Sequence, residues 1–266
     1  MTFLKKTTAI IITLAMLAAA PGCRRNNIAP AGEKIKRPNE AFLTYGDTNE
    51  TIVELSKVNS SVWVHTSYYE EKGVLVPSNG LVVVTKNGLV LIDATRTERQ
   101  MESLDKLVSE AFNSGFQSAF ITQAHPNRLG GASYLLKKDI PVSSLPVVAK
   151  AAEKKGFVVP DIISQGDSAV FNIDGTDFEL YYPGEGHSQD NTVLWLEKEK
   201  LLYGGYITAE YGAGSLSNTE EANLKTWPES IKAIQDRYPE IDIVVPGHGQ
   251  WGDSSLLDYT LELLKE

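Results

Sequence analysis

The sequence predicts an α/β fold with four layers, an αββα sandwich in which two mixed sheets pack between outer helices. Two observations predict it: hairpins are followed by strand–helix units around residues 97–155, and the same order returns around residues 227–264. Each half leaves one sheet face uncovered, and packing the two faces together buries both. The 266 residues suffice for one such domain with a large core.

The N-terminal residues 1–23 have the pattern of an export signal. Two lysines precede an apolar run over residues 9–20, which is too short for a stable membrane span. Cys23, the only cysteine, follows Ala20-Pro21-Gly22 and resembles the acylated cysteine of a bacterial lipobox. We therefore expect a periplasmic lipoprotein that touches the membrane only through this lipid. Ordinary export with an unmodified thiol is the alternative.

Residues 24–49 are polar and contain Pro30, Gly32 and Pro38, which predicts a flexible tether to a domain over residues 50–266. The formal net charge of −9 argues against nucleic acid as a partner. With one cysteine the chain has no internal disulfide. We expect a monomer that acts on a small molecule.

The first half of the domain is expected to be β-rich. Four stretches rich in β-branched or apolar residues are predicted strands: 51–57, 61–67, 80–85 and 89–93. The last two flank Asn87-Gly88, a strong hairpin signal, and residues 68–78 form either a hairpin flap or an exposed loop. An apolar stripe predicts a helix over residues 97–112, capped by Thr97 and ended by Gly115.

Strands and helices alternate in the rest of the chain. The predicted strands are residues 118–122, 140–142, 169–173, 178–182, 192–196, 201–203 and 241–245. The predicted helices are residues 130–137, 145–155, 227–237 and 254–264. Gly156 is expected to end the second of these helices.

Three of the four histidines lie in loops that each follow an apolar strand. His125 lies in Gln123-Ala124-His125-Pro126-Asn127, His187 in Gly184-Glu185-Gly186-His187-Ser188, and His248 in Pro246-Gly247-His248-Gly249. Because imidazole is a common zinc ligand, their convergence predicts a pocket suited to metal chemistry. In the alternative, Gln123 and Asn127 hydrogen-bond the histidines in a metal-free cavity. His65 lies in a strand without such a motif and is expected to be structural.

These runs resemble the metallo-β-lactamase family, in its subclass with two zinc sites, over about residues 53–264. Asn79-Gly80-Leu81 and the run over residues 88–93 belong to the same resemblance. It implies the αββα fold and hydrolysis of a β-lactam amide by a zinc-bound hydroxide.

The resemblance also implies a ligand set, and half of that set is substituted. The family's three histidines at the first zinc site correspond to Gln123, His125 and His187. Its aspartate, cysteine and histidine at the second site correspond to Asn127, Tyr206 and His248. An amide oxygen is a poorer zinc ligand than imidazole, and the second site has lost both anionic ligands. Tyr206 is also large enough to fill the second metal's place. We therefore expect at most one zinc ion, at the first site, and reduced activity.

The resemblance further suggests residues for catalysis and substrate binding. Asn127 replaces the aspartate that orients the attacking water, and Asn218 matches an asparagine that helps to polarise the lactam carbonyl. Ala209 stands where the family often has a lysine for the substrate carboxylate. An apolar wall of the groove is expected from Trp63, Tyr68, Tyr69, Val74 and Val76.

Two other functions remain open. The substituted ligands favour a catalytically inactive binding protein that keeps the groove. Ala209 instead leaves room for a zinc hydrolase of another ester, lactone or amide.

Overall fold

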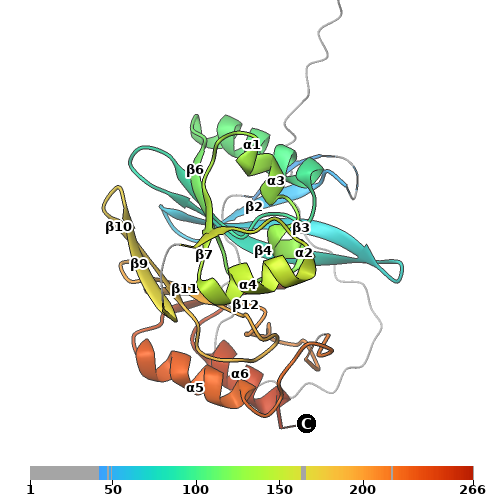
Figure 1. Ribbon diagram of the computed structural model, residues 1–266, viewed down its shortest axis with the longest axis vertical. Coiled ribbons are helices and arrows are strands. Elements are labelled where there is room, and N and C mark those ends of the chain that lie inside the picture. The colour runs from blue at the N-terminus through green and yellow to red at the C-terminus, as the bar shows by residue number, and fades with distance from the viewer. Residues whose placement is uncertain (1–41, 47, 49, 163–165, 217, 266) are drawn as a thin grey trace, which may run out of the picture.

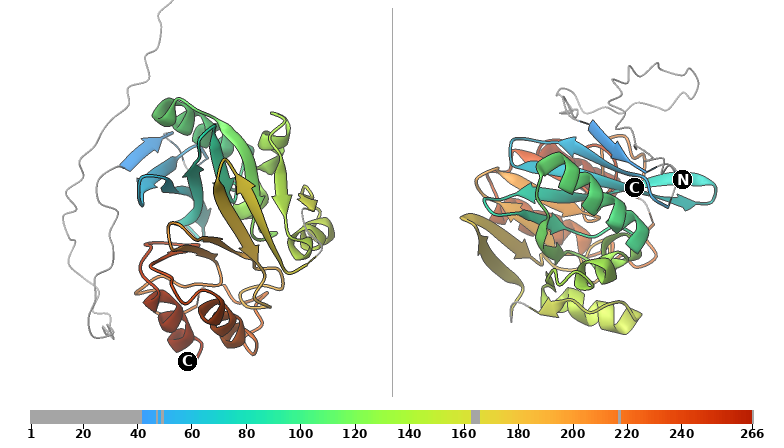
Figure 2. Two further views of the ribbon diagram at one scale, coloured as in Figure 1. Left: turned by 90° about the vertical axis from the view of Figure 1, so that its left-hand side faces the viewer. Right: turned by 90° about the horizontal axis from the view of Figure 1, so that it is seen from above.

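Two sheets lie back to back between helices, as predicted, in a computed structural model of the protein (Figures 1 and 2). It describes residues 42–46, 48, 50–162, 166–216 and 218–265. The predicted signal segment, Cys23 and most of the predicted tether lie outside these residues. Within the described ranges, no helix has the length and apolar character needed to cross a membrane.

Within the described residues, the larger sheet has eight strands in sequence order. They are β1 (Phe42–Tyr45), β2 (Val53–Lys57), β3 (Val62–Glu71), β4 (Val74–Val84), β5 (Leu89–Ile92), β6 (Phe116–Ile121), β7 (Val142–Ser144) and β8 (Asp161–Ile162). The first five are antiparallel and the last three join in parallel. β1 lies within the predicted tether, so the domain boundary near residue 50 was placed too late: this short strand forms an edge by pairing with β2.

The segment over residues 68–78 is a hairpin flap rather than a loop. β3 and β4 stay paired as far as Glu71 and Val74. Lys72 and Gly73 connect them with φ angles of 52° and 78°, which suit the tight turns of two-residue hairpins. The flap tip extends beyond the body of the sheet (Figure 1).

The helices of the first half are α1 (Glu98–Phe112), α2 (Pro126–Leu129), α3 (Ala132–Leu136) and α4 (Pro146–Lys155). Thr97 caps α1 and the helix ends at Phe112, as predicted, although its C-cap is Asn113, with φ 49°, and not Gly115. The helix predicted over residues 130–137 is confirmed as the shorter α3, whereas α2 was not predicted. Gly131 donates its backbone N–H to the Thr95 carbonyl (2.7 Å), and this tertiary contact separates α2 from α3.

The smaller sheet has the strand order β13-β12-β11-β10-β9. Its strands are β9 (Ser168–Ile173), β10 (Thr176–Tyr181), β11 (Val193–Leu196), β12 (Leu201–Gly205) and β13 (Ile243–Pro246). Only β12 and β13 pair in parallel. The helices α5 (Trp227–Arg237) and α6 (Ser255–Leu263) cover its outer face (Figure 1).

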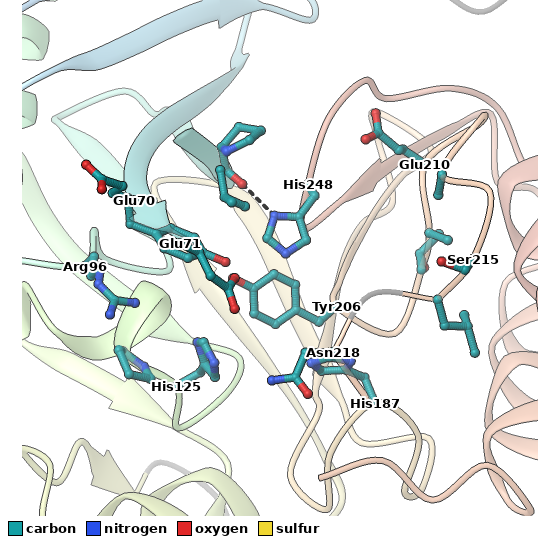
Figure 3. A pocket seen from close by; sticks show the side chains of 18 of the residues that line it. Glu70, Glu71, Arg96, His125, His187, Tyr206, Glu210, Ser215, Asn218 and His248 are labelled. Atoms are coloured by element: carbon teal, nitrogen blue, oxygen red, sulfur yellow. Dashed lines mark hydrogen bonds between the residues drawn. The ribbon is translucent and has the colours of Figure 1, made fainter. Parts of the chain in front are cut away.

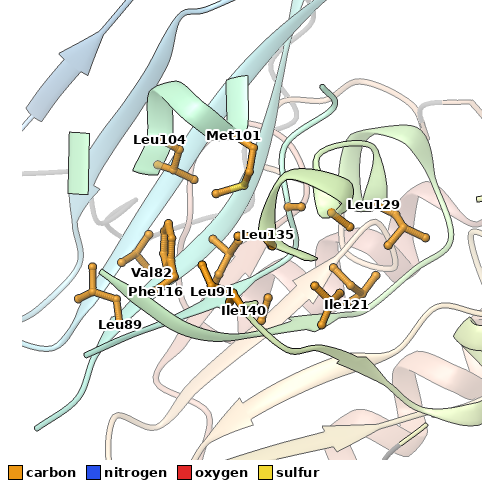
Figure 4. Close-up of a cluster of buried hydrophobic side chains, with 14 of the residues drawn as sticks. Val82, Leu89, Leu91, Met101, Leu104, Phe116, Ile121, Leu129, Leu135 and Ile140 are labelled. Carbon is orange, nitrogen blue, oxygen red and sulfur yellow. The ribbon is translucent and has the colours of Figure 1, made fainter. Parts of the chain in front are cut away.

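Three apolar layers hold the sandwich together. Met101, Leu104 and Leu135 pack against the outer face of the large sheet (Figure 4). A second cluster lies between the sheets, and a third joins the small sheet to α5 and α6. Val82 and Leu91 belong to the first cluster, whereas their strand neighbours belong to the second. Both faces of β5 and of residues 80–83 of β4 are therefore buried.

Candidate active site

The three loop histidines meet at one end of the two sheets. His125 follows β6 as the N-cap of α2, His187 lies between β10 and β11, and His248 follows β13. All three line a pocket with a cavity volume of about 630 Å³ (Figure 3). Two sheets thus contribute to one site, because each histidine loop leaves its strand at the same end of the sandwich.

Tyr206 lies at the centre of these histidines. Its ring centroid is 5.4 Å from that of His125, 5.1 Å from that of His187 and 4.6 Å from that of His248, on which it stacks. β12 ends just before it at Gly205, whose φ of 55° turns the chain. We call Tyr206 and the three histidines the Tyr206 cluster.

Hydrogen bonds and a cation fix the phenol. Asn127 Nδ2 donates to the Tyr206 hydroxyl (2.9 Å), while Asn127 Oδ1 accepts from Arg96 (2.7 Å). The guanidinium carbon of Arg128 lies 4.0 Å from the ring centroid. Gly247 packs so closely against the ring and Arg128 that a side chain there would collide with both. The space for a phenol therefore depends on glycine at this position.

Beneath the cluster lies a buried charged layer, which we call the floor: Asp93, Thr122, Arg128 and Tyr203. Asp93 and Arg128 are fully buried and 3.4 Å apart. The Asp93 carboxylate also accepts from the Thr122 backbone N–H (2.7 Å), the Thr122 hydroxyl (2.7 Å) and the Tyr203 hydroxyl (2.8 Å). Asp93 is thus structural.

His65 is structural as well. Its Nε2 donates to the Asp93 carbonyl at 2.9 Å, and it is almost completely buried.

The histidines of the cluster favour their neutral form. Burial lowers the pKa of His125 to about 3, and Arg128 adds to this effect. Burial lowers the pKa of His187 to about 4, as do His248 and Arg128. Burial also lowers the pKa of His248 to about 4, although its Nδ1 donates to the Pro77 carbonyl at 2.5 Å. His187 is only 8 % exposed, and in the described part of the chain no hydrogen bond reaches its ring.

Gln123 connects two loops instead of lining the pocket. Its Nε2 donates to the Ser188 hydroxyl (2.8 Å), and that hydroxyl donates to Asp190 (2.8 Å). Asp190 also accepts from the Ala124 backbone N–H (2.6 Å). Asp190 and Asn191, whose side chain accepts from the Ser188 N–H (2.9 Å), shape this loop, as expected.

The arranged donors do not fit a zinc ion. Among the described residues, no group of three or more His, Cys, Asp or Glu side chains could hold a metal. Zinc would require donor atoms about 2 Å away on several sides. Between the three imidazoles, however, the space holds the Tyr206 ring, and Asn127 is engaged with Arg96 and that phenol.

The predicted substrate residues are only partly brought together. Asn218 lines the pocket, and its Oδ1 accepts from the Glu220 backbone N–H (3.0 Å). Tyr69 and Val76 line it too. Trp63, Tyr68 and Val74, also predicted for the apolar wall, are not among the residues that line the pocket.

Strand alternation and packing explain the positions of these three side chains. Trp63 packs against Phe112 on α1, with ring centroids 5.3 Å apart. Tyr68 points to the opposite face from Tyr69 and donates to Glu54 (2.6 Å). Val74 lies at the flap tip and is 62 % exposed.

Several lining residues were missed from the sequence. They include Glu71, Arg96, Glu210 and Trp227. The alternation of β3 could have identified Glu71, because residues two apart on a strand share a face and Tyr69 was already a candidate. No local pattern marks Arg96 or Trp227.

Known proteins resemble this chain along most of its length. No protein-family model matches it. The metallo-β-lactamase type 2 of Bacillus sp. (strain 170) is 39 % identical over 221 residues, which cover 82 % of this chain and 84 % of the relative. The corresponding protein of Bacillus cereus is 38 % identical and covers 82 % and 85 %.

A solved structure agrees with these relatives. The metallo-β-lactamase from Pontibacter korlensis superposes with a TM-score of 0.78 at 39 % identity, covering 80 % of this chain and 99 % of that protein. The fold, the placement of the histidine loops and these similarities lead to one assignment. The chain belongs to the metallo-β-lactamase family of hydrolases.

Proposed function

We propose that this protein recognises a β-lactam-like small molecule in the pocket of the Tyr206 cluster, and that its zinc-dependent hydrolysis is weak or absent. The observation that carries the proposal is the contact of the Tyr206 ring with all three histidines. A side chain that occupies the space between these imidazoles competes with any metal ion for it.

The chemistry of the substituted residues supports low hydrolytic activity. Asn127 is neutral, so it cannot take a proton from an attacking water as a carboxylate can. Both ends of its amide are already used, by Arg96 and by Tyr206. Asn127 itself therefore supplies neither a base nor a negative charge to offset a divalent cation.

The pocket, in contrast, remains suitable for binding a small molecule. The cavity of about 630 Å³ has the size of pockets that bind drug-like molecules. Aromatic rings of Tyr69, Tyr206 and Trp227 line it, and Asn218 adds an amide. Few convergent polar groups on an apolar surface are typical of small-molecule sites.

The test restores the family's ligands in one variant, Gln123→His/Asn127→Asp/Tyr206→Cys. We expect its nitrocefin turnover to exceed that of wild type by roughly 100-fold or more, the size that loss of a major catalytic group produces. Wild type should bind nitrocefin in calorimetry while turning it over slowly. A folded, zinc-loaded variant without gain would contradict the proposal, as would rapid turnover by wild type.

A second candidate is a hydrolase with one zinc ion held by Gln123, His125 and His187. The neutral state of both histidines favours it, because a neutral imidazole can ligate. It requires the Tyr206 ring to move aside. One zinc per chain, lost in His125→Ala or His187→Ala, would support this candidate against the first. If β-lactams are not hydrolysed by that zinc form, Ala209 makes a lactone or ester screen the next step.

We also propose export and acylation at Cys23, on the strength of the sequence pattern. Radiolabelled palmitate should enter the full-length protein in a bacterial host but not its Cys23→Ser variant. Export without label would show ordinary secretion instead.

A further inference from the structure

The ionisable side chains around the pocket are mainly acidic. The residues that line it include three carboxylates, those of Glu70, Glu71 and Glu210, and one guanidinium, that of Arg96. That guanidinium already donates to Asn127 (2.7 Å) and lies 4.8 Å from the Tyr69 ring centroid. Ala209 adds no charge. A ligand that enters the pocket therefore meets more negative than positive charge.

Glu71 lines the pocket near the flap tip, where it is also exposed to solvent. It shares a face of β3 with Tyr69, and its side chain points toward the centre, in the direction of Tyr206 (Figure 3). Glu70 points away, and Glu210 accepts from the Gln250 backbone N–H at 3.0 Å. In the described part of the chain, no lysine or arginine forms an ion pair with Glu71.

The aromatic rings near Glu71 already have partners: Arg96 lies over Tyr69, and Arg128 and His248 lie against Tyr206. The ammonium group of a ligand would therefore be attracted by the carboxylates. The His187 ring, more than nine-tenths buried, lines the same cavity and has no hydrogen bond within the described residues. It provides a polar group for a ligand, independently of the carboxylates.

We propose that the pocket selects small molecules that carry an ammonium group, and that Glu71 is the specificity-determining residue. The inference rests on the proposed function, because it assigns the charge of the molecule that this pocket binds. A molecule with only a carboxylate would meet Glu71 without a compensating cation.

Two β-lactams that differ by one ammonium group test this inference. Ampicillin has an amino group that benzylpenicillin lacks. By isothermal titration calorimetry at low salt, we expect ampicillin to bind wild type about threefold more tightly, the effect of a solvent-exposed charge pair. Glu71→Gln should abolish the preference. Glu110→Gln, with the same change of net charge on α1 and outside the pocket lining, should keep the preference.

The outcomes separate the inference from the proposed function. Equal affinities, or tighter binding of benzylpenicillin, would overturn the inference and leave β-lactam recognition intact. If neither β-lactam binds, β-lactam recognition fails, and benzyltrimethylammonium then decides the inference. Binding of this aromatic cation to wild type but not to Glu71→Gln would support the inference, and absence of binding to wild type would overturn it.

Discussion

The floor and the Tyr206 cluster lie one above the other, but their buried polar groups differ in charge and in hydrogen-bond partners. In the floor, Asp93 and Arg128 form a fully buried ion pair and find their partners within the protein, although burial raises the pKa of Asp93. In the cluster, the histidines are neutral, and His187 has no hydrogen-bond partner in the described part of the chain. A buried charge without a partner costs free energy, so we expect the floor to stabilise the fold. We expect the cluster to interact with the ligand.

Removing the cation of the floor should have the largest effect. In Arg128→Met the Asp93 carboxylate remains buried without its ion-pair partner, which typically costs about 3–5 kcal/mol. Guanidinium denaturation should show a fall of this size in the free energy of unfolding. Asp93→Asn/Arg128→Met is the matched control and should recover part of the loss. A decrease below about 1 kcal/mol in the single variant would contradict the structural role of the floor.

Low pH should reduce the free energy of unfolding through His65, which lies against the floor. Burial lowers its pKa from 6.5 to about 4. As pH falls through 6.5, the unfolded chain takes up this proton before the folded protein does. Stability is therefore retained above pH 6.5 and lost between pH 6.5 and about 4.

The measurement compares unfolding of wild type and His65→Gln at pH 7 and pH 4. Between these values, wild type should lose about 3 kcal/mol more than the variant. Parallel losses in the two proteins would place the acid sensitivity elsewhere.

Removing one hydroxyl from the cluster should have a smaller effect. Tyr206→Phe keeps the ring against the histidines but leaves Asn127 Nδ2 without its acceptor, which should cost about 1–2 kcal/mol. Zinc content should not rise, because the ring still fills the space. A gain of zinc in this variant would show that the hydroxyl, and not the ring, excludes metal.

The flap should contribute least to stability. Tyr68→Phe removes a hydrogen bond to Glu54, a partly buried group, and should lower the free energy of unfolding by less than about 1 kcal/mol. Denaturation of this variant alongside Arg128→Met measures the contrast directly. Equal losses would mean that the flap is as important to folding as the floor.

The sequence predicted most of the fold because local pattern and tertiary environment agree. β5 and residues 80–83 of β4 are apolar on both faces, and both faces are buried. The prediction was less accurate where contacts distant in sequence determine the structure. Gly131 bonds to Thr95, so that α3 begins only at Ala132, and β1 pairs with β2.

The residues of the site also divide into those that the local sequence predicts and those whose positions depend on distant contacts. The histidine loops follow strands and could be recognised, and the size of Tyr206 already indicated competition with a metal. Trp63 was misplaced because its partner, Phe112, lies on a helix whose packing no local pattern gives. The positions of Arg96 and Trp227 likewise depend on how the two halves meet.

The central claim is that Tyr206 has taken the place of metal between the three histidines. Zinc per chain, measured by elemental mass spectrometry, tests it most directly, on protein purified with zinc and dialysed without chelator. We predict almost none in folded wild type and about one or two ions in Gln123→His/Asn127→Asp/Tyr206→Cys, the number that the family's two sites hold. One zinc in wild type, lost with His125→Ala or His187→Ala, would contradict the claim.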